Sequence, residues 1–195
     1  MLTIGILNLQ GAVSEHYSIT KKAIKNMNIN AEAKTVRYAE DVSGCNGIII
    51  SGGESTVIGK ILFERGIDQI IKNEKIPVFG TCAGMVLLGK KTNYEQPLLG
   101  LMDIEVVRNS FGRQKDSFET ELQILGETYP GVFIRAPTLK SYDKTKKDIK
   151  VLCKVNNTIV AIQQNHNLAM SFHPELTNDT RLHEYFIQEV SKCVE

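Results

Sequence analysis

Short apolar runs alternate with amphipathic stretches along the first half of the chain. The runs are bounded by turn residues, which predicts strands, and the stretches between them repeat apolar residues at helical spacing. The expected strands are Ile4–Leu9, Ala31–Val36, Gly47–Ile50 and Ile76–Phe79, and the expected helices are Val13–Met27, Ser55–Asn73 and Ala83–Lys90, with a polar loop after Val36. This alternation predicts an α/β fold with a mostly parallel central sheet covered by helices on both faces.

The second half of the chain has a different pattern, in which strands follow one another with few helices between them. They are expected at Ile104–Arg108, Phe118–Leu122, Gly131–Ile134, Ile149–Val155, Ile159–Gln163 and Leu168–Phe172. We expect them to extend the central sheet as antiparallel additions. A last amphipathic helix, about Asp179–Val194, should begin at a cap formed by Asn178 or Asp179 and close the domain.

Composition and charge narrow the function classes. A chain of 195 residues is expected to form a single domain, residues 1–195. With 23 basic and 22 acidic residues the net charge is +1, and no basic stripe points to nucleic acid. The sequence has no run of 18 apolar residues and no signal peptide pattern, so we expect a cytoplasmic protein without membrane association. Its four cysteines form no C-x-x-C pair, so neither a metal site nor a disulfide framework is expected.

The segment Gly80-Thr81-Cys82-Ala83-Gly84 lies between a predicted buried strand and a predicted apolar helix. It has the form G-x-C-x-G, the thiol counterpart of the nucleophile turn of α/β hydrolases. Glycines at both ends permit a sharp turn, and the helix amino terminus favours a thiolate at Cys82. The N–H of Ala83 is a candidate donor to an oxyanion. The alternative is a buried cysteine in a tight loop.

A candidate base follows at the end of a later predicted strand. Here the chain reads Ser-Phe-His-Pro-Glu-Leu at positions 171–176. A thiol nucleophile needs a base that takes up its proton and returns it, and the imidazole of His173 titrates in the right range. Glu175 lies two residues further on and can fix the tautomer of the ring. We expect the other histidines, His16, His166 and His183, to be core or surface residues.

Two kinds of segment are candidates for binding a substrate near this thiol. The loop Ser51-Gly52-Gly53-Glu54-Ser55 follows a central strand, where its paired glycines can present an N–H as a second oxyanion donor, with Ser55 as a helix cap in the alternative reading. The segment Asn8-Leu9-Gln10-Gly11-Ala12 should lie at the same edge, where a polar amide could meet the substrate or cap the first helix. Arg108 and Arg135 are candidates to bind a carboxylate, and structural ion pairs are the alternative.

Together these segments resemble the class I glutamine amidotransferases, and more narrowly the glutaminase subunit of pyridoxal phosphate synthase. The broader resemblance is carried by Gly80–Gly84 and Ser171–Leu176. The narrower one is carried by Leu9-Gln10-Gly11-Ala12, Gly52–Thr56, Arg108–Gln114 with Asp116–Glu119, Phe133–Pro137 and the extension to Thr177. These matches are spread over nearly the whole chain.

The resemblance implies a flavodoxin-like three-layer domain that hydrolyses L-glutamine to glutamate and ammonia through Cys82, His173 and Glu175. A glutamyl thioester would be the intermediate, no metal or organic cofactor would be needed, and the ammonia would pass to a separate synthase subunit in a hetero-oligomer. It implies an oxyanion hole at Gly53 and Ala83, and a glutamine pocket lined by Gly52, Gly53, Glu54, Ser55, Arg108, Ile134 and Arg135.

Other functions remain open from the sequence. One is a glutaminase that serves another amidotransferase, or a γ-glutamyl hydrolase with the same nucleophile turn. Another is a catalytically silent α/β scaffold subunit, which would lack the nucleophile or the base.

Overall fold

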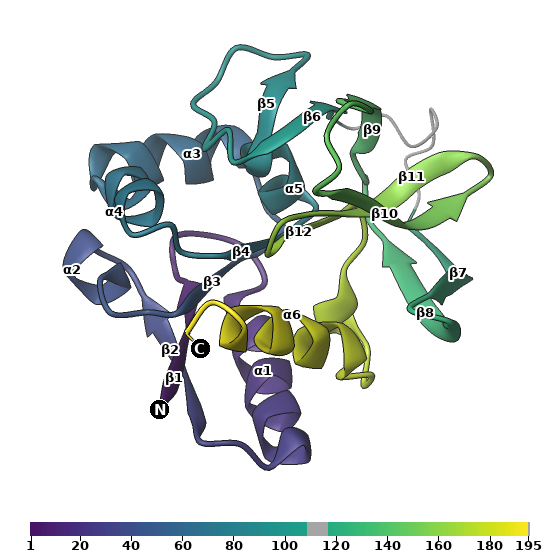
Figure 1. Ribbon diagram of the computed structural model, residues 1–195. Coiled ribbons are helices and arrows are strands. Elements are labelled where there is room, and N and C mark those ends of the chain that lie inside the picture. The colour runs from purple at the N-terminus through teal and green to yellow at the C-terminus, as the bar shows by residue number, and fades with distance from the viewer. Residues whose placement is uncertain (109–116, 195) are drawn as a thin grey trace.

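The computed structural model describes residues 1–108 and 117–194. Its centre is a seven-stranded sheet in the order β10-β11-β12-β4-β3-β1-β2 (Figure 1). The strands are β1 (Leu2–Leu7), β2 (Ala31–Val36), β3 (Gly47–Ile50), β4 (Val78–Thr81), β10 (Ile149–Val155), β11 (Thr158–Gln164) and β12 (Asn167–Met170). Strands β2, β1, β3, β4 and β12 run parallel, and β11 and β10 are added antiparallel. The predicted mostly parallel α/β sheet is confirmed.

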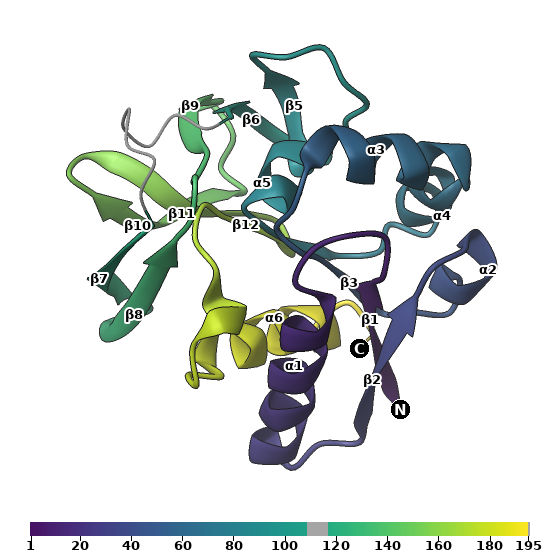
Figure 2. The ribbon, with the colours of Figure 1, turned by 180° about the vertical axis from the view of Figure 1, so that it is seen from behind.

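Helices cover both faces of this sheet, which gives three layers (Figures 1 and 2). Helices α1 (Val13–Met27) and α6 (Arg181–Ser191) pack together on one face, and α3 (Ser55–Glu64), α4 (Ile67–Asn73) and α5 (Ala83–Leu88) lie on the other. The core is accordingly divided into two apolar clusters, one on each side of the strands. Strand β3 contributes to both, because Ile48 and Ile50 face one cluster and Ile49 the other.

Two predictions for the first half were wrong. The expected helix Ser55–Asn73 is divided into α3 and α4 at Gly66, whose φ of 66° is a left-handed conformation that ends a helix. The expected polar loop after β2 contains a short helix, α2 (Ala39–Val42), whose first turn is capped by Asp41 through the N–H groups of Arg37 and Tyr38.

The prediction that all the later strands extend the central sheet was also wrong. In the described part of the chain, β10 and β11 are added by antiparallel pairing, while β12, predicted as Leu168–Phe172, joins the sheet parallel to β4. Strands β5 (Gly89–Thr92), β6 (Met102–Val107) and β9 (Thr138–Tyr142) form a second sheet, and β7 (Phe118–Ile124) and β8 (Glu127–Phe133) form a hairpin. Neither β5 nor β9 was predicted as a strand, and β5 begins within the expected helix Ala83–Lys90. Strands β5 and β6 pack on α5, and Phe133 of β8 packs against Phe172. These strands therefore bury apolar residues without pairing to the central sheet.

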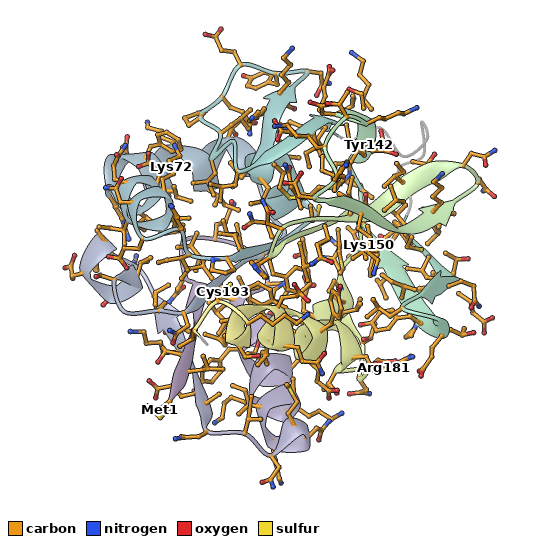
Figure 3. The ribbon with its side chains drawn as sticks, in the orientation of Figure 1. Met1, Lys72, Tyr142, Lys150, Arg181 and Cys193 are labelled. Atoms are coloured by element: carbon orange, nitrogen blue, oxygen red, sulfur yellow. The ribbon has the colours of Figure 1, made fainter. Side chains whose placement is uncertain are left out.

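The last helix begins later than predicted, at Arg181, and its N-cap is Thr180, whose side chain makes no capping bond. Asp179 instead accepts from the backbone N–H and the guanidinium of Arg181. Figure 3 shows Arg181 at the end of α6 that lies toward the β7-β8 hairpin. Arg181 also donates to the carbonyl of Thr128 in this hairpin and pairs with Glu127. One side chain therefore joins the start of α6 to the hairpin.

The parallel strands bring distant segments to one edge of the sheet. The loops after β1, β3, β4 and β12 all leave from the carboxyl ends of adjacent strands. The predicted nucleophile, base and glycine loop are therefore neighbours, as expected for ligand sites in parallel sheets. None of the helices in the described part of the chain combines the length and apolar character needed to cross a bilayer.

Candidate active site

Cys82 occupies a strained turn between β4 and α5. Its backbone has φ 50° and ψ −103°, a conformation that costs a non-glycine residue about 1–3 kcal/mol. The flanking glycines are required by packing. A Cβ on Gly80 would lie 2.5 Å from the carbonyl oxygen of Gly84, and a Cβ on Gly84 would lie 2.3 Å from that of Ile50. The turn therefore holds the thiol in a fixed position, with Sγ 3.9 Å from the carbonyl oxygen of Ile134.

His173 and Glu175 follow β12 and lie beside this turn. The imidazole Nδ1 is 2.7 Å from Glu175 Oε1, and the Glu175 side chain is fully buried. Residues Pro174–Leu176 form a single 3-10 turn, in which the proline fixes the spacing between the two side chains. Because a carboxylate only accepts, Nδ1 carries the proton in this pair and Nε2 is left to face the thiol.

The electrostatics of His173 depend on both neighbours. Burial of the ring opposes its protonation, but the Cys82 thiol and the Glu175 carboxylate outweigh burial and raise the pKa of His173 to about 10. Nε2 makes no regular hydrogen bond within the described residues. The thiol and the ring are thus close but not yet joined by a regular hydrogen bond, a geometry common in substrate-free active sites.

The glycine loop after β3 lies directly against the cysteine and the histidine. A Cβ on Gly52 would stand 2.4 Å from His173 Cε1 and 3.3 Å from Cys82 Cβ. Gly53 has a φ of 147° and, with Ala83, lines a small cavity around Cys82. The two predicted oxyanion donors are therefore brought to the same cavity as the thiol.

Most of the remaining predicted pocket residues line this cavity. Its lining includes Glu54, Ser55, Arg108 and Arg135. Ile134 is not part of the lining, although its carbonyl oxygen lies 3.9 Å from Cys82 Sγ. Arg108 pairs with Glu54 and lies 3.3 Å from Gln96 Oε1 through Nη1. The two charged side chains predicted to bind a substrate thus bind each other in the free protein. The matched residues 109–116, Arg113 among them, lie outside the described residues.

Two capping alternatives raised by the sequence are wrong. Glu54, and not Ser55, is the N-cap of α3, and it accepts from the N–H of Thr56. Gln10 does not cap α1, since its Oε1 accepts from the N–H of Glu54, 3.0 Å away. Gln10 therefore holds the glycine loop in place.

A buried histidine pair behind the triad was not assigned a role from the sequence. His16 of α1 has its Nε2 3.2 Å from Glu175 Oε2 and 3.1 Å from Thr81 Oγ1, and its Nδ1 3.0 Å from His183 Nε2 of α6. Both histidines have no exposed surface. Burial lowers the pKa of His16 well below its usual range and that of His183 to about 3, so both rings are neutral at pH 7.

These neutral rings predict a pH dependence of stability. Below pH 6.5 the unfolded chain protonates at His183 while the native chain does not until about pH 3, so unfolding is favoured as the pH falls. Replacing His183 with Gln should remove about 1.4 kcal/mol of the stability loss between pH 7.5 and 5.5. Urea unfolding at both pH values measures this difference. A loss of stability in His183→Gln equal to that of the wild type would contradict the neutral state assigned to this ring.

Among residues 1–108 and 117–194, no group of three or more His, Cys, Asp or Glu side chains is arranged to hold a metal ion. The chemistry of the site is instead defined by its cysteine, histidine and glutamate. The fold and the site together define the class of protein: a three-layer α/β domain with a cysteine, a histidine and a glutamate gathered at the carboxyl edge of its sheet.

Comparison with known proteins identifies the family. Residues 6–192 match the SNO glutamine amidotransferase family, and the chain belongs to that family. It is 73% identical over its full length to the whole of pyridoxal 5'-phosphate synthase subunit PdxT of Methanobrevibacter smithii, and 55% identical over the same extent to PdxT of Methanothermobacter thermautotrophicus. A crystal structure described as a glutamine amidotransferase matches with a TM-score of 0.85 and 42% identity, over 96% of this chain and 98% of the other.

Proposed function

We propose that this chain is the glutaminase subunit of a pyridoxal 5'-phosphate synthase and hydrolyses L-glutamine to L-glutamate and ammonia. The observation that carries the proposal is the contact of 2.7 Å between His173 Nδ1 and Glu175 Oε1 beside a cysteine held in a strained turn. Membership of the SNO glutamine amidotransferase family and the name of the full-length relatives support the same activity.

The reaction proceeds in two halves. The Cys82 thiolate attacks the side-chain amide carbon of glutamine, and the N–H groups of Gly53 and Ala83 stabilise the oxyanion. The His173 imidazolium gives its proton to the leaving nitrogen, the C–N bond breaks, and ammonia and a glutamyl thioester remain. The neutral imidazole then takes a proton from water, the hydroxide attacks the thioester, and glutamate and the thiolate are released. Glu175 keeps the proton of Nδ1 in place throughout.

Substrate selection falls to the residues around the cavity. A free amino acid carries a carboxylate and an ammonium group, and Arg108 and Glu54 have the complementary charges. Because these two side chains pair with each other in the free protein, glutamine has to replace their mutual contact with its own. Gly52, Gly53, Ser55, Ile134 and Arg135 complete the pocket.

The names of the relatives also imply a partner. Both are subunits of a synthase, so we propose that this chain, a single cytoplasmic domain, docks on a synthase subunit and delivers ammonia to it. Co-expression tests this proposal. The two subunits should co-purify, and glutamine should support pyridoxal phosphate formation by the pair. Failure to co-purify together with preferential cleavage of γ-glutamyl peptides would instead assign the chain as a γ-glutamyl hydrolase.

Gly52→Ala should disable the site without unfolding the protein. The new Cβ would lie 2.4 Å from His173 Cε1, so the ring has to shift to make room for it. A displacement of about 1 Å at a reacting group costs about 100-fold in rate, so we expect kcat for glutamine to fall by about that factor. Steady-state ammonia release measures kcat, and the unfolding midpoint serves as the control. A variant with wild-type kcat would contradict the packing described here.

A further inference from the structure

The second oxygen of Glu175 has an unusual environment. Glu175 Oε1 accepts from His173, while Oε2 is buried and makes no regular hydrogen bond within the described residues. A buried carboxylate oxygen without a donor is costly, about 1–3 kcal/mol or more. His16 Nε2 lies 3.2 Å from it. The same nitrogen is also hydrogen-bonded with Thr81 Oγ1, 3.1 Å away.

The charges around His16 determine which ring nitrogen carries its proton. If Nε2 were unprotonated, its lone pair would face a carboxylate oxygen at 3.2 Å in a site without solvent. Nε2 therefore carries the proton, and Nδ1 accepts from His183 Nε2, 3.0 Å away. His183 of α6 thus supplies the donor that this tautomer of His16 requires.

We propose that His16 is a positioning residue for glutamine hydrolysis, which directs its Nε2–H at the buried oxygen of Glu175 and holds that carboxylate against His173. The inference rests on the proposed function. A neutral donor suits this place, since a lysine or arginine here would compete with His173 for the charge of Glu175. The same N–H reaches Thr81, the residue before Cys82. His16 thereby connects the carboxylate turn to the nucleophile turn from a third element, α1.

Replacements of His16 by Gln and Asn form a matched pair that tests this role. A Gln amide reaches the place of Nε2 and can donate to Glu175, whereas an Asn amide reaches only the place of Nδ1. With the synthase subunit present, His16→Asn should lower kcat about tenfold, the factor expected for one lost hydrogen bond to a charged group, with an unchanged KM for glutamine. His16→Gln should retain most of the wild-type kcat. His166→Leu, which removes a histidine–carboxylate contact distant from the triad, is the control and should have no effect.

A second readout does not depend on glutaminase activity. In a Cys193→Ser background, which removes the exposed thiol, the rate of Cys82 alkylation by iodoacetamide can be followed in the free chain at pH 6 and pH 9.5. His16→Asn should slow alkylation about tenfold at pH 6, where the thiolate depends on a well-held imidazolium, and leave the rate at pH 9.5 unchanged. If wild type failed to hydrolyse glutamine, the proposed function would fail while this ratio still tested the role of His16.

Two results would overturn the proposal. One is a His16→Asn variant with wild-type kcat and a wild-type alkylation ratio. The other is an equal loss in the Asn and Gln variants accompanied by an equal fall in their unfolding midpoints, which would assign His16 a purely structural role.

Discussion

Replacing Cys82 with alanine should abolish glutamine hydrolysis, with a loss in kcat of at least about 1,000-fold. The proposed reaction passes through a covalent thioester, and no other thiol is placed to form it. Cys45 and Cys153 are buried in the core, and Cys193 lies at the exposed end of the chain after α6. Ammonia release in the presence of the synthase subunit is the measurement. Substantial turnover in this variant would remove the basis of the proposed mechanism.

Cys82→Ser makes this test sharper because it keeps the shape of the side chain. A serine hydroxyl has a far higher pKa than a thiol, so a histidine tuned to a thiol activates it poorly, and we expect the same loss of turnover. Neither variant should impair folding, since the strained turn is held by Gly80 and Gly84. Retained docking on the synthase, measured by co-purification, is the control that separates lost chemistry from lost assembly.

The reacting groups and the sheet could be predicted because their signals are local. A cysteine with glycines on both sides, placed after a buried strand, predicts a sharp turn at that cysteine. The two-residue spacing of His173 and Glu175 allows the contact between their side chains that the structure contains. Parallel strands then bring the two segments to one edge. These inferences need only short segments of sequence and the rule that the carboxyl ends of parallel strands lie at one edge of the sheet.

The histidine pair could not be predicted in the same way. His16 lies on the buried face of α1 with Ile19, Thr20 and Ala23, and His183 lies on that of α6 with Phe186 and Ile187. This spacing indicates that both rings are buried, and a buried polar group needs a partner. Which partner it finds depends on how two helices 167 positions apart pack against each other, and no local pattern contains that information.

The smaller sheets were mispredicted for a related reason. Alternating apolar residues indicate a strand with one buried face, but they do not indicate which neighbour it pairs with. Strands β5 and β6 contact α5, β9 contacts β11, β7 contacts β10, and Phe133 of β8 packs on Phe172. For β6, β7 and β8 the pattern predicted a strand and was wrong about its pairing. For β5 and β9 it predicted no strand.

Glu175→Gln should lower kcat by about 1,000-fold or more, in line with loss of the orienting acid in related triads. A glutamine amide that donates to His173 Nδ1 places the ring proton on Nε2, where it blocks proton transfer from the thiol. If the amide instead points its oxygen at His173 Nδ1, its NH₂ group takes the place of Oε2. Two donors then face each other, because the N–H of His16 lies 3.2 Å from that place. Neither orientation satisfies both neighbours, so steric similarity does not rescue function.

Loss of the carboxylate should also change the charge of His173. Glu175 is one of the two groups that raise the pKa of His173 to about 10, and without it the opposing effect of burial gains weight. The imidazolium that protonates the leaving nitrogen should then be lost at lower pH, so the alkaline limb of the kcat profile should move toward neutrality. Glu189→Gln is the matched control, because Glu189 is also buried and contacts His166, 3.1 Å away. An equal loss in both variants would trace the defect to a buried charge in general and contradict a specific role for Glu175.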